Sequence, residues 1–387
     1  MRRPALTLLL LLLAACADPP LASLLPGAAD ATPPVADAEL ADADAVDVPT
    51  TPTPDATDPA ADATPDTPPD ATDEAADAPQ DAAAPDDVLH PPKLGPPYPI
   101  VLAHGFFGAD SFAGIGFATY FYGVRDDLLA HGETHVITPA VDPFQSSPYR
   151  GAQLQKAIED LLAQTGHAKV VLIGHSQGGL DARWVAAQRP DLVAAVVTFS
   201  TPHQGTPVAD AALGLMPWKG AQKLVDSLLQ FVGKPVWSQL DGQTSLAQSM
   251  QQLSTPAMKE FNATVKDQPG VAYYSLAGRS ALALAKSECQ PQVAVPFAQK
   301  YDKKVDTLDA MLWATREVVD GGLFKAIPHD GLVRVADARW GTFLGCVPAD
   351  HLDEIGHLFG DPPGIGNPFD HKAFYRELVA WLRGQGY

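Results

Sequence analysis

The segment Gly-His-Ser-Gln-Gly at residues 174–178 is the feature that most restricts what this chain can fold into. It follows an apolar, strand-like run at 170–173 and precedes a helical pattern at 180–188. A glycine-x-serine-x-glycine sequence between a strand and a helix is typical of a tight turn that exposes the serine, because the glycines leave room for the turn. Ser176 is therefore predicted to be a nucleophile. The alternative interpretation is a glycine-rich structural turn.

Short, β-branched apolar runs alternate with helical patterns from Pro96 onward. The expected strands cover residues 100–102, 136–138, 170–173, 196–199 and 271–274, and a helix is expected over 153–164. Alternating strands and helices favour a mainly parallel sheet with helices on both faces. The chain from 96 to 387 is therefore predicted to be a single α/β domain.

Residues 205–250 interrupt that alternation. An apolar stripe at helical spacing runs through the segment and consists of Leu224, Val225, Leu228, Leu229 and Val232. Such a stripe is typical of a helix packed on the core. Because the segment follows a strand close to the predicted nucleophile, a mobile apolar lid over the site is the favoured interpretation.

The N-terminus has the pattern of an export signal. Arg2 and Arg3 precede an apolar run at 5–15 that is too short to cross a bilayer as a helix. The run leads into Leu-Ala-Ala-Cys, which resembles the lipobox of bacterial lipoproteins, where the cysteine, here Cys16, is acylated. We expect residues 1–15 to be removed and a lipid on Cys16 to hold the exported protein on a bacterial membrane, at the outer membrane or cell surface. The alternative is an ordinary secretory peptide and a secreted protein.

Residues 16–95 are predicted to be a disordered tether. They are mostly Ala, Asp, Pro and Thr and show no apolar period, so they cannot bury enough surface to offset chain entropy. Residues 17–92 hold 18 of the 46 acidic residues and no lysine or arginine. The net charge of −20 therefore belongs largely to the tether, where it favours solubility and argues against nucleic-acid binding.

The chain contains three cysteines. With Cys16 assigned to the lipid, Cys289 and Cys346 remain, and export would permit a disulfide between them. The sequence by itself leaves that pairing open.

A serine nucleophile needs an imidazole to take its proton and a carboxylate to orient that imidazole. When the serine lies on a strand-to-helix turn, the acid and then the histidine follow it along the chain. His351 is the predicted base and Asp330, upstream of it, the predicted acid. By spacing alone, His371 with Asp350 or Asp353 remains open.

Two other histidines are interpreted as structural. His203 follows the nucleophile too soon for the expected order, and His104 is expected to tie its own loop together. That loop, at 104–108, follows the first strand, where backbone N–H groups that stabilise a tetrahedral oxyanion are expected. The predicted donors are the N–H groups of Phe106 and Gln177.

Six short motifs resemble, in order and content, those of the bacterial triacylglycerol lipases of Pseudomonas and Burkholderia, which have the α/β-hydrolase fold. The motifs cover residues 98–105, 122–123, 174–179, 201–203, 330–333 and 351–355. The resemblance extends over most of residues 97–360. It implies Ser176 as nucleophile, His351 as base, Asp330 as its partner and a lid from 205 to about 250.

The resemblance also implies a structural calcium ion near the loop of the predicted base, while no cofactor is expected for catalysis. Motif position makes Asp306 and Asp353 carboxylate ligands, with the side chain of His357 and the carbonyl of Asp361 completing the shell. Calcium prefers oxygen ligands, so a histidine at 357 departs from the family. Cys346 also departs, because the family's second cysteine comes soon after the acid. Family members often need a lipase-specific folding chaperone, which would be a partner here.

The predicted activity is hydrolysis of carboxylic esters through an acyl-enzyme, with acylglycerols at a lipid–water interface as the leading substrates. An esterase for soluble esters or an acyltransferase would use the same triad, and activity that rises when the substrate forms an emulsion distinguishes the lipase. A non-catalytic surface binding module on this scaffold is a third hypothesis. Failure to react with a serine-directed fluorophosphonate would indicate it.

Overall fold

A computed structural model of the protein describes most of the chain beyond residue 91. The described residues are 92–106, 120–216, 246–280, 286–301, 304, 306–322, 327–357, 363–364 and 366–387. The predictions for the signal, Cys16, most of the tether, the apolar stripe of the lid and Asp361 lie outside these ranges.

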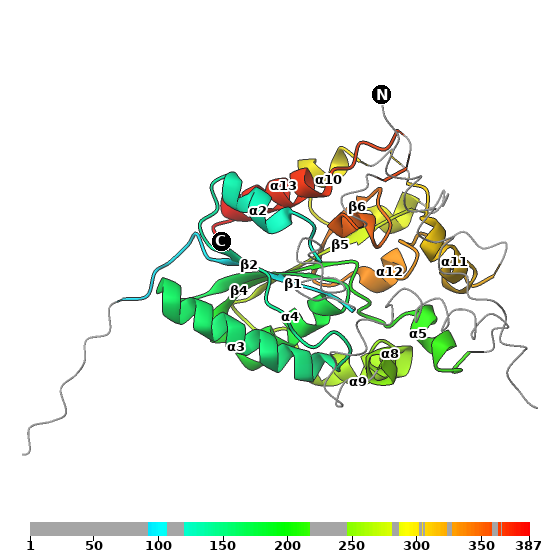
Figure 1. Ribbon diagram of the computed structural model, residues 1–387, viewed down its shortest axis with the longest axis horizontal. Coiled ribbons are helices and arrows are strands. Elements are labelled where there is room, and N and C mark those ends of the chain that lie inside the picture. Colours follow the sequence, from blue (N-terminus) through cyan, green and yellow to red (C-terminus); the bar gives the residue numbers. More distant parts are fainter. Residues whose placement is uncertain are drawn as a thin grey trace, which may run out of the picture. The chain divides into compact units, whose positions relative to one another are not determined.

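A six-stranded parallel sheet forms the centre of the described part (Figure 1). The strands are β1 (Ile100–Ala103), β2 (Val136–Ile137), β3 (Val170–His175), β4 (Val193–Phe199), β5 (Ala272–Gly278) and β6 (Thr342–Val347). Their order across the sheet is β2-β1-β3-β4-β5-β6. The prediction of an α/β fold with a mainly parallel sheet is confirmed.

Helices cover both faces of the sheet, with α3 and α4 on one face and α2, α10 and α13 on the other (Figure 1). The helices are α2 (Val124–Ala130), α3 (Ser147–Thr165), α4 (Gln177–Gln188), α5 (Pro207–Ala212), α8 (Leu246–Gln252), α9 (Thr255–Thr264), α10 (Pro296–Gln299), α11 (Trp313–Asp320), α12 (Val335–Ala338) and α13 (His371–Gly384). Short 3-10 turns are η1 (Pro190–Leu192), η2 (Lys286–Cys289), η3 (Ala310–Leu312) and η4 (Asp353–Ile355). Within the described ranges, no helix combines the length and the apolar character needed to cross a bilayer.

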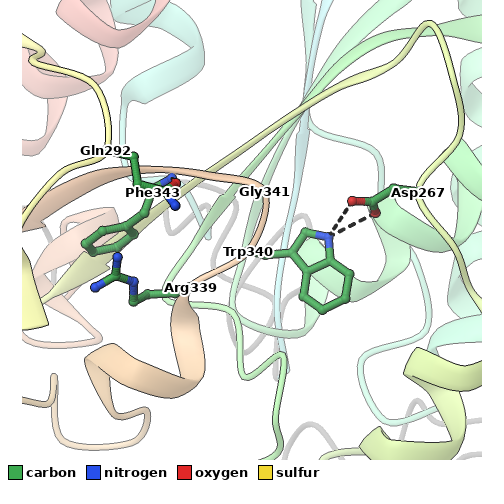
Figure 2. Close-up of a pocket in the computed structure, with 6 residues that line it drawn as sticks. All are labelled: Asp267, Gln292, Arg339, Trp340, Gly341 and Phe343. Carbon is green, nitrogen blue, oxygen red and sulfur yellow. Dashed lines mark hydrogen bonds between the residues drawn. The ribbon is translucent and has the colours of Figure 1, made fainter.

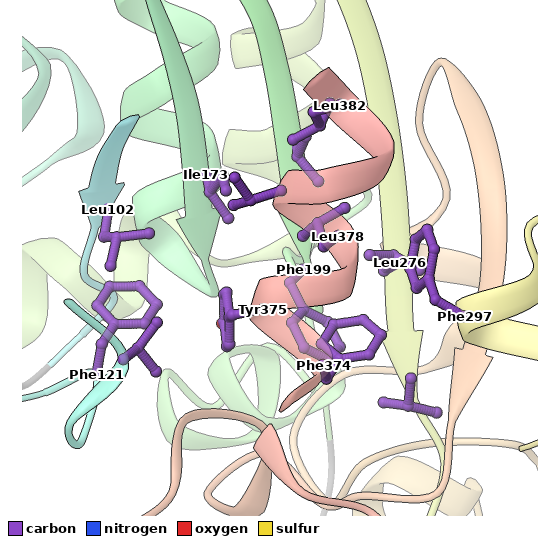
Figure 3. Packing of buried hydrophobic residues seen from close by; sticks show 14 of the residues in the cluster. Leu102, Phe121, Ile173, Phe199, Leu276, Phe297, Phe374, Tyr375, Leu378 and Leu382 are labelled. Carbon is purple, nitrogen blue, oxygen red and sulfur yellow. The ribbon is translucent and has the colours of Figure 1, made fainter. Parts of the chain in front are cut away.

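The alternation of side chains along each strand produces two hydrophobic cores. Ile100 and Leu102 of β1 belong to the core that also contains Phe374 and Leu378 of α13 (Figure 3). Val101, between them, belongs to the core on the side of α3 and α4. Since both faces of the central strands are buried, these strands are apolar throughout, which is why they could be located from the sequence.

Each of the five expected strands corresponds to an observed strand. The sixth, β6, was not expected, and it contains Gly345, whose φ is 120°. Its pairing with β5 also shifts register between Ser275 and Ala277. At the other end, Leu94 was assigned to the tether but pairs with His167 in a parallel bridge. The folded part therefore begins before residue 96.

Cys289, at the end of η2, and Cys346, in β6, form a disulfide with Cα atoms 5.3 Å apart. The pairing that the sequence left open is therefore present. The bridge lies beside the apolar side chains of Val335 and Phe343. It joins residues 57 positions apart in the chain, so it restricts the unfolded state more than the folded one.

Replacing both cysteines by serine should lower the free energy of unfolding by about 2–4 kcal/mol, because the unfolded chain regains freedom. Urea unfolding with and without reductant measures this difference. Reductant should lower the midpoint of the wild-type protein and leave that of the double variant unchanged. Equal midpoints for the two proteins under oxidising conditions would contradict a stabilising bridge.

Candidate active site

Ser176 lies in the tight turn between β3 and α4. Its backbone has φ 55° and ψ −130°, and a positive φ is rare for a residue with a side chain. The turn is so close that a Cβ on Gly174 would lie 2.5 Å from the carbonyl oxygen of Gly178. The serine is thus held at the carboxyl end of β3 in the strained conformation typical of a nucleophile elbow.

Asp330 and His351 form a buried pair. Asp330 Oδ2 lies 2.7 Å from His351 Nδ1, and Asp330 Oδ1 accepts the backbone N–H groups of Leu332 and Val333. Burial raises the pKa of Asp330, but the charge of His351 and these hydrogen bonds outweigh it and hold the pKa below its usual value. Asp330 is therefore a carboxylate that fixes the Nδ1–H tautomer of His351, with Nε2 as the basic nitrogen.

The imidazole of His351 lies next to the nucleophile turn. Its ring centroid is 4.5 Å from that of His175, the residue directly before Ser176. Parallel strands explain this convergence, because β3 ends at His175 and β6 ends shortly before His351, so both loops emerge at the same edge of the sheet. The structure thus brings the three predicted triad residues to one edge.

The alternative base, His371, makes a different contact. It is the first residue of α13, and its Nε2 donates to the carbonyl oxygen of Tyr122 at 2.8 Å. Asp350, one of its proposed partners, accepts the backbone N–H groups of Leu352 and Asp353. The carboxylate contact that orients a catalytic imidazole is therefore the one from Asp330 to His351.

The two predicted oxyanion donors lie on segments packed against each other. A Cβ on Gly105 would lie 2.6 Å from Ser176 Cβ, and a Cβ on Gly178 would lie 2.1 Å from a carbonyl oxygen at the end of β1. Gln177 is the first residue of α4, so its N–H has no carbonyl partner within the helix and lies at the positive end of the helix dipole. Phe106 directly follows Gly105 on the facing loop. Both backbones can thus approach a group bound to the serine.

A buried arginine that the sequence did not reveal holds the 104–106 loop. Arg150 donates to the carbonyl oxygens of His104 and Asp142, both at 2.6 Å, and to Asp181 Oδ2 at 2.8 Å. Burial raises the pKa of Asp181 to about 6, although Arg150 opposes that rise. The partners lie 8 to 46 residues from Arg150, so no local motif could indicate this contact.

His104 and His203 make structural contacts, as the sequence predicted. His104 Nε2 accepts the N–H of Val141 at 3.1 Å, so Nδ1 carries the proton and donates to Gly105 O at 3.0 Å. Burial lowers the pKa of His104 to about 3, which keeps it neutral. His203 is fully buried and stacks on Trp340, with ring centroids 5.2 Å apart.

A surface pocket of about 330 Å³ lies beside the amino-terminal end of β6 (Figure 2). Its lining residues are Asp267, Gln292, Arg339, Trp340, Gly341 and Phe343. Trp340 Nε1 donates to both carboxylate oxygens of Asp267, at 2.9 and 3.1 Å. No triad residue lines this pocket, and the triad lies at the opposite, carboxyl ends of the strands, so the pocket is separate from the candidate active site.

Three buried aspartates cluster beside the His351 loop. Carboxylate oxygens of Asp306, Asp350 and Asp353 lie within 4.8 Å of one another. Among the described residues, Oδ2 of Asp306 and Oδ2 of Asp353 have no hydrogen-bond partner. Burial and the neighbouring carboxylates raise the pKa values of Asp306, Asp350 and Asp353 to about 6, 7 and 9. Clustered oxygen ligands with unpaired lone pairs fit a divalent cation such as calcium.

This cluster differs from the ligand set that the family resemblance implied. Asp306 and Asp353 belong to it as expected, and Asp350 is an additional member. His357 is not part of the carboxylate group, and its ring packs against Tyr120 with centroids 5.7 Å apart. Asp350, and not His357, therefore completes this group of buried carboxylates.

Comparisons with known proteins identify the family of the chain. Residues 98–276 match a family model described as the alpha/beta hydrolase fold. A triacylglycerol lipase of Vibrio cholerae is 33% identical, covering 75% of this chain and 88% of its own length, and one of Burkholderia plantarii is 31% identical, covering 79% and 91%. A solved metagenomic carboxyl esterase shares the fold, with a TM-score of 0.52 at 19% identity over 79% of this chain and 82% of its own. The chain therefore belongs to the bacterial triacylglycerol lipase family of the α/β-hydrolase fold.

Proposed function

We propose that this carboxylic ester hydrolase cleaves triacylglycerols through an acyl-enzyme on Ser176. Two relatives covered over most of their length are triacylglycerol lipases, which supports that substrate class. The observation that carries the proposal is the buried pair of Asp330 and His351, 2.7 Å apart, beside the strained turn that holds Ser176.

Acylation begins when Ser176 Oγ attacks the ester carbonyl carbon and His351 Nε2 takes the serine proton. The carbonyl oxygen becomes an oxyanion, which the N–H groups of Phe106 and Gln177 stabilise. Asp330 stays ionised and stabilises the imidazolium. Collapse of the tetrahedral intermediate breaks the ester C–O bond, and His351 gives its proton to the departing alcohol oxygen, leaving the acyl group on Ser176.

Deacylation repeats these steps with water. His351 takes a proton from water, the resulting hydroxide attacks the acyl carbon, and the same N–H groups stabilise the second oxyanion. The C–O bond to Ser176 then breaks and the serine oxygen recovers the proton from His351. The products are a fatty acid and a diacylglycerol.

Ser176→Ala should leave a folded protein whose kcat for a triacylglycerol emulsion is at least about 1000-fold lower, because the nucleophile is lost. Titration of released fatty acid measures the activity, and circular dichroism checks the fold. The wild-type protein should react covalently with a fluorophosphonate and the variant should not. A folded variant that keeps its activity would refute the assignment.

We further propose that Asp306, Asp350 and Asp353 hold a structural calcium ion. Their clustered, partly unpaired oxygens support this site. When bound, calcium would offset the mutual repulsion of the carboxylates, and it would brace the turn next to His351 without taking part in the chemistry.

Calcium should raise the melting temperature by about 5–10 °C over the protein in chelator when its concentration is about 100 times Kd. Since the pKa values of the aspartates are raised, calcium must displace protons, so its affinity should fall as the pH is lowered from 9 to 6. Differential scanning calorimetry measures both effects. Asp353→Asn should abolish the shift and Asp370→Asn, at an exposed helix cap, should keep it. A shift that survives Asp353→Asn would place the ion elsewhere.

We also propose that a lipid on Cys16 anchors the exported protein to a membrane, because the lipobox-like sequence precedes a long acidic, proline-rich stretch. A lipase-specific folding chaperone stays a prediction. Growth with an alkyne-labelled fatty acid should label the wild-type protein and deliver it to the membrane fraction. The Cys16→Ser protein should carry no label and should not be recovered in the membrane fraction. A labelled Cys16→Ser protein would contradict the proposal.

A further inference from the structure

A chain of buried hydrogen bonds lies behind the triad, and the catalytic steps above do not use it. The Tyr120 hydroxyl lies 2.7 Å from His175 Nδ1, and His175 Nε2 lies 2.8 Å from Glu354 Oε2. The Ser200 hydroxyl donates to the other carboxylate oxygen, Glu354 Oε1, at 2.6 Å. All four side chains are buried, so these contacts are protected from competition with water.

The partners at the two ends of this series of hydrogen bonds fix which group donates in each bond. Gly278 N–H donates to Ser200 Oγ at 2.9 Å, so the Ser200 proton is directed to Glu354. The backbone of Gly105 hydrogen-bonds the Tyr120 hydroxyl, so Tyr120 donates its own proton to His175 Nδ1. The proton on His175 Nε2 is then donated to Glu354. Glu354 therefore accepts a hydrogen bond from each side. Burial, and next the charge of Asp330, raises the pKa of Glu354 well above its usual value, and the hydrogen bond from Ser200 opposes that rise.

These contacts join segments that carry the reacting groups. Gly105 belongs to the oxyanion loop, and His175 directly precedes the nucleophile. Glu354 lies in η4, three residues after His351. The three segments are thus held together through one buried carboxyl group. One of its oxygens hydrogen-bonds to His175 of β3, and the other to Ser200 in the turn after β4.

The surrounding backbone is shaped to admit this carboxylate. A Cβ on Gly278 would lie 1.8 Å from Glu354 Oε1, so only glycine fits there without displacing the carboxylate. Ser200 has φ 46°, a conformation in which glycine would be less strained. A serine at this strained position is consistent with a need for its hydroxyl.

Glu354 also determines where the base lies relative to the nucleophile. The ring centroids of His351 and His175 lie 4.5 Å apart. A ring nitrogen of each histidine and a carboxylate oxygen of Glu354 all lie within 4.8 Å of one another. Because Glu354 shares a turn with His351 and bonds the neighbour of Ser176, moving its carboxylate would move the imidazole against the hydroxyl. A misplacement of about 1 Å can cost about 100-fold in rate.

We propose that Glu354 and Ser200 are positioning residues for the reaction: the Ser200–Glu354–His175 contacts hold the histidine loop at the distance from Ser176 that proton transfer requires. This inference rests on the proposed function, since it assumes that Ser176 and His351 react. Neither residue is assigned a contact with the substrate, so their loss should change kcat and leave KM nearly unchanged.

Ser200→Gly tests the proposal, because it removes the hydroxyl and relaxes the strained backbone at the same time. Ser275→Ala is the matched control: Ser275 is also buried and also bridges two groups, the carbonyl oxygen and N–H of Trp340, but in the middle of β5. On a soluble ester with excess calcium, Ser200→Gly should lower kcat at least about tenfold with KM within about twofold. Ser275→Ala should lower the melting temperature and keep kcat within about twofold.

Glu354→Gln provides a second, isosteric test, because an amide cannot accept from both sides. It should lower kcat and the rate of Ser176 labelling by a fluorophosphonate in parallel, with calcium-dependent stabilisation retained. If it fails to fold, Tyr120→Phe, which removes only the terminal hydroxyl, takes its place with a smaller decrease expected. Folded Ser200→Gly and Glu354→Gln proteins with kcat within twofold of wild type would overturn the inference. Ser176→Ala in the same assay separates the cases, since its activity would overturn the proposed function itself.

Discussion

Close backbone packing around the turn between β3 and α4 is the constraint on which the rest of the site depends. Gly174 and Gly178 leave no room for a side chain, and Gly105 approaches Ser176 equally closely from the loop after β1. The strained φ of Ser176 persists because β3 is paired on both sides and α4 packs on the sheet. The position of the nucleophile is therefore fixed by the backbone, and the other groups are arranged around it.

Buried polar side chains surround this turn, and most of them are paired. Arg150 bonds to Asp181, Asp330 to His351, and Glu354 to His175. A buried charge is costly without a partner, so each pair ties together segments that are distant in the chain. Asp306 Oδ2 and Asp353 Oδ2 are among the buried polar atoms of the described residues that have no hydrogen-bond partner, and their closeness to a third carboxylate is the reason for proposing a cation there.

Local patterns were enough to predict the strands and the nucleophile, whereas distant contacts were not predictable. β3 and β4 are buried on both faces and hence continuously apolar, and Ser176 lies in a motif whose geometry depends only on its neighbours. β6 was missed because Gly345 interrupts a short, mixed run. Asp350 was not recognised as a member of the aspartate cluster, because its closeness to Asp306 depends on how two loops fold together. For the same reason, the sequence did not indicate Arg150 or the contact between His175 and Glu354.

The bridge between Leu94 and His167 fixes where the chain enters the catalytic fold. Both residues precede strands, β1 and β3, so they lie at the edge where the sheet begins, while Ser176 and His351 lie at the edge where it ends. An attachment through the residues before Leu94 would therefore act at the edge of the sheet where the strands begin. An attachment there is separated from Ser176 and His351 by the length of the strands.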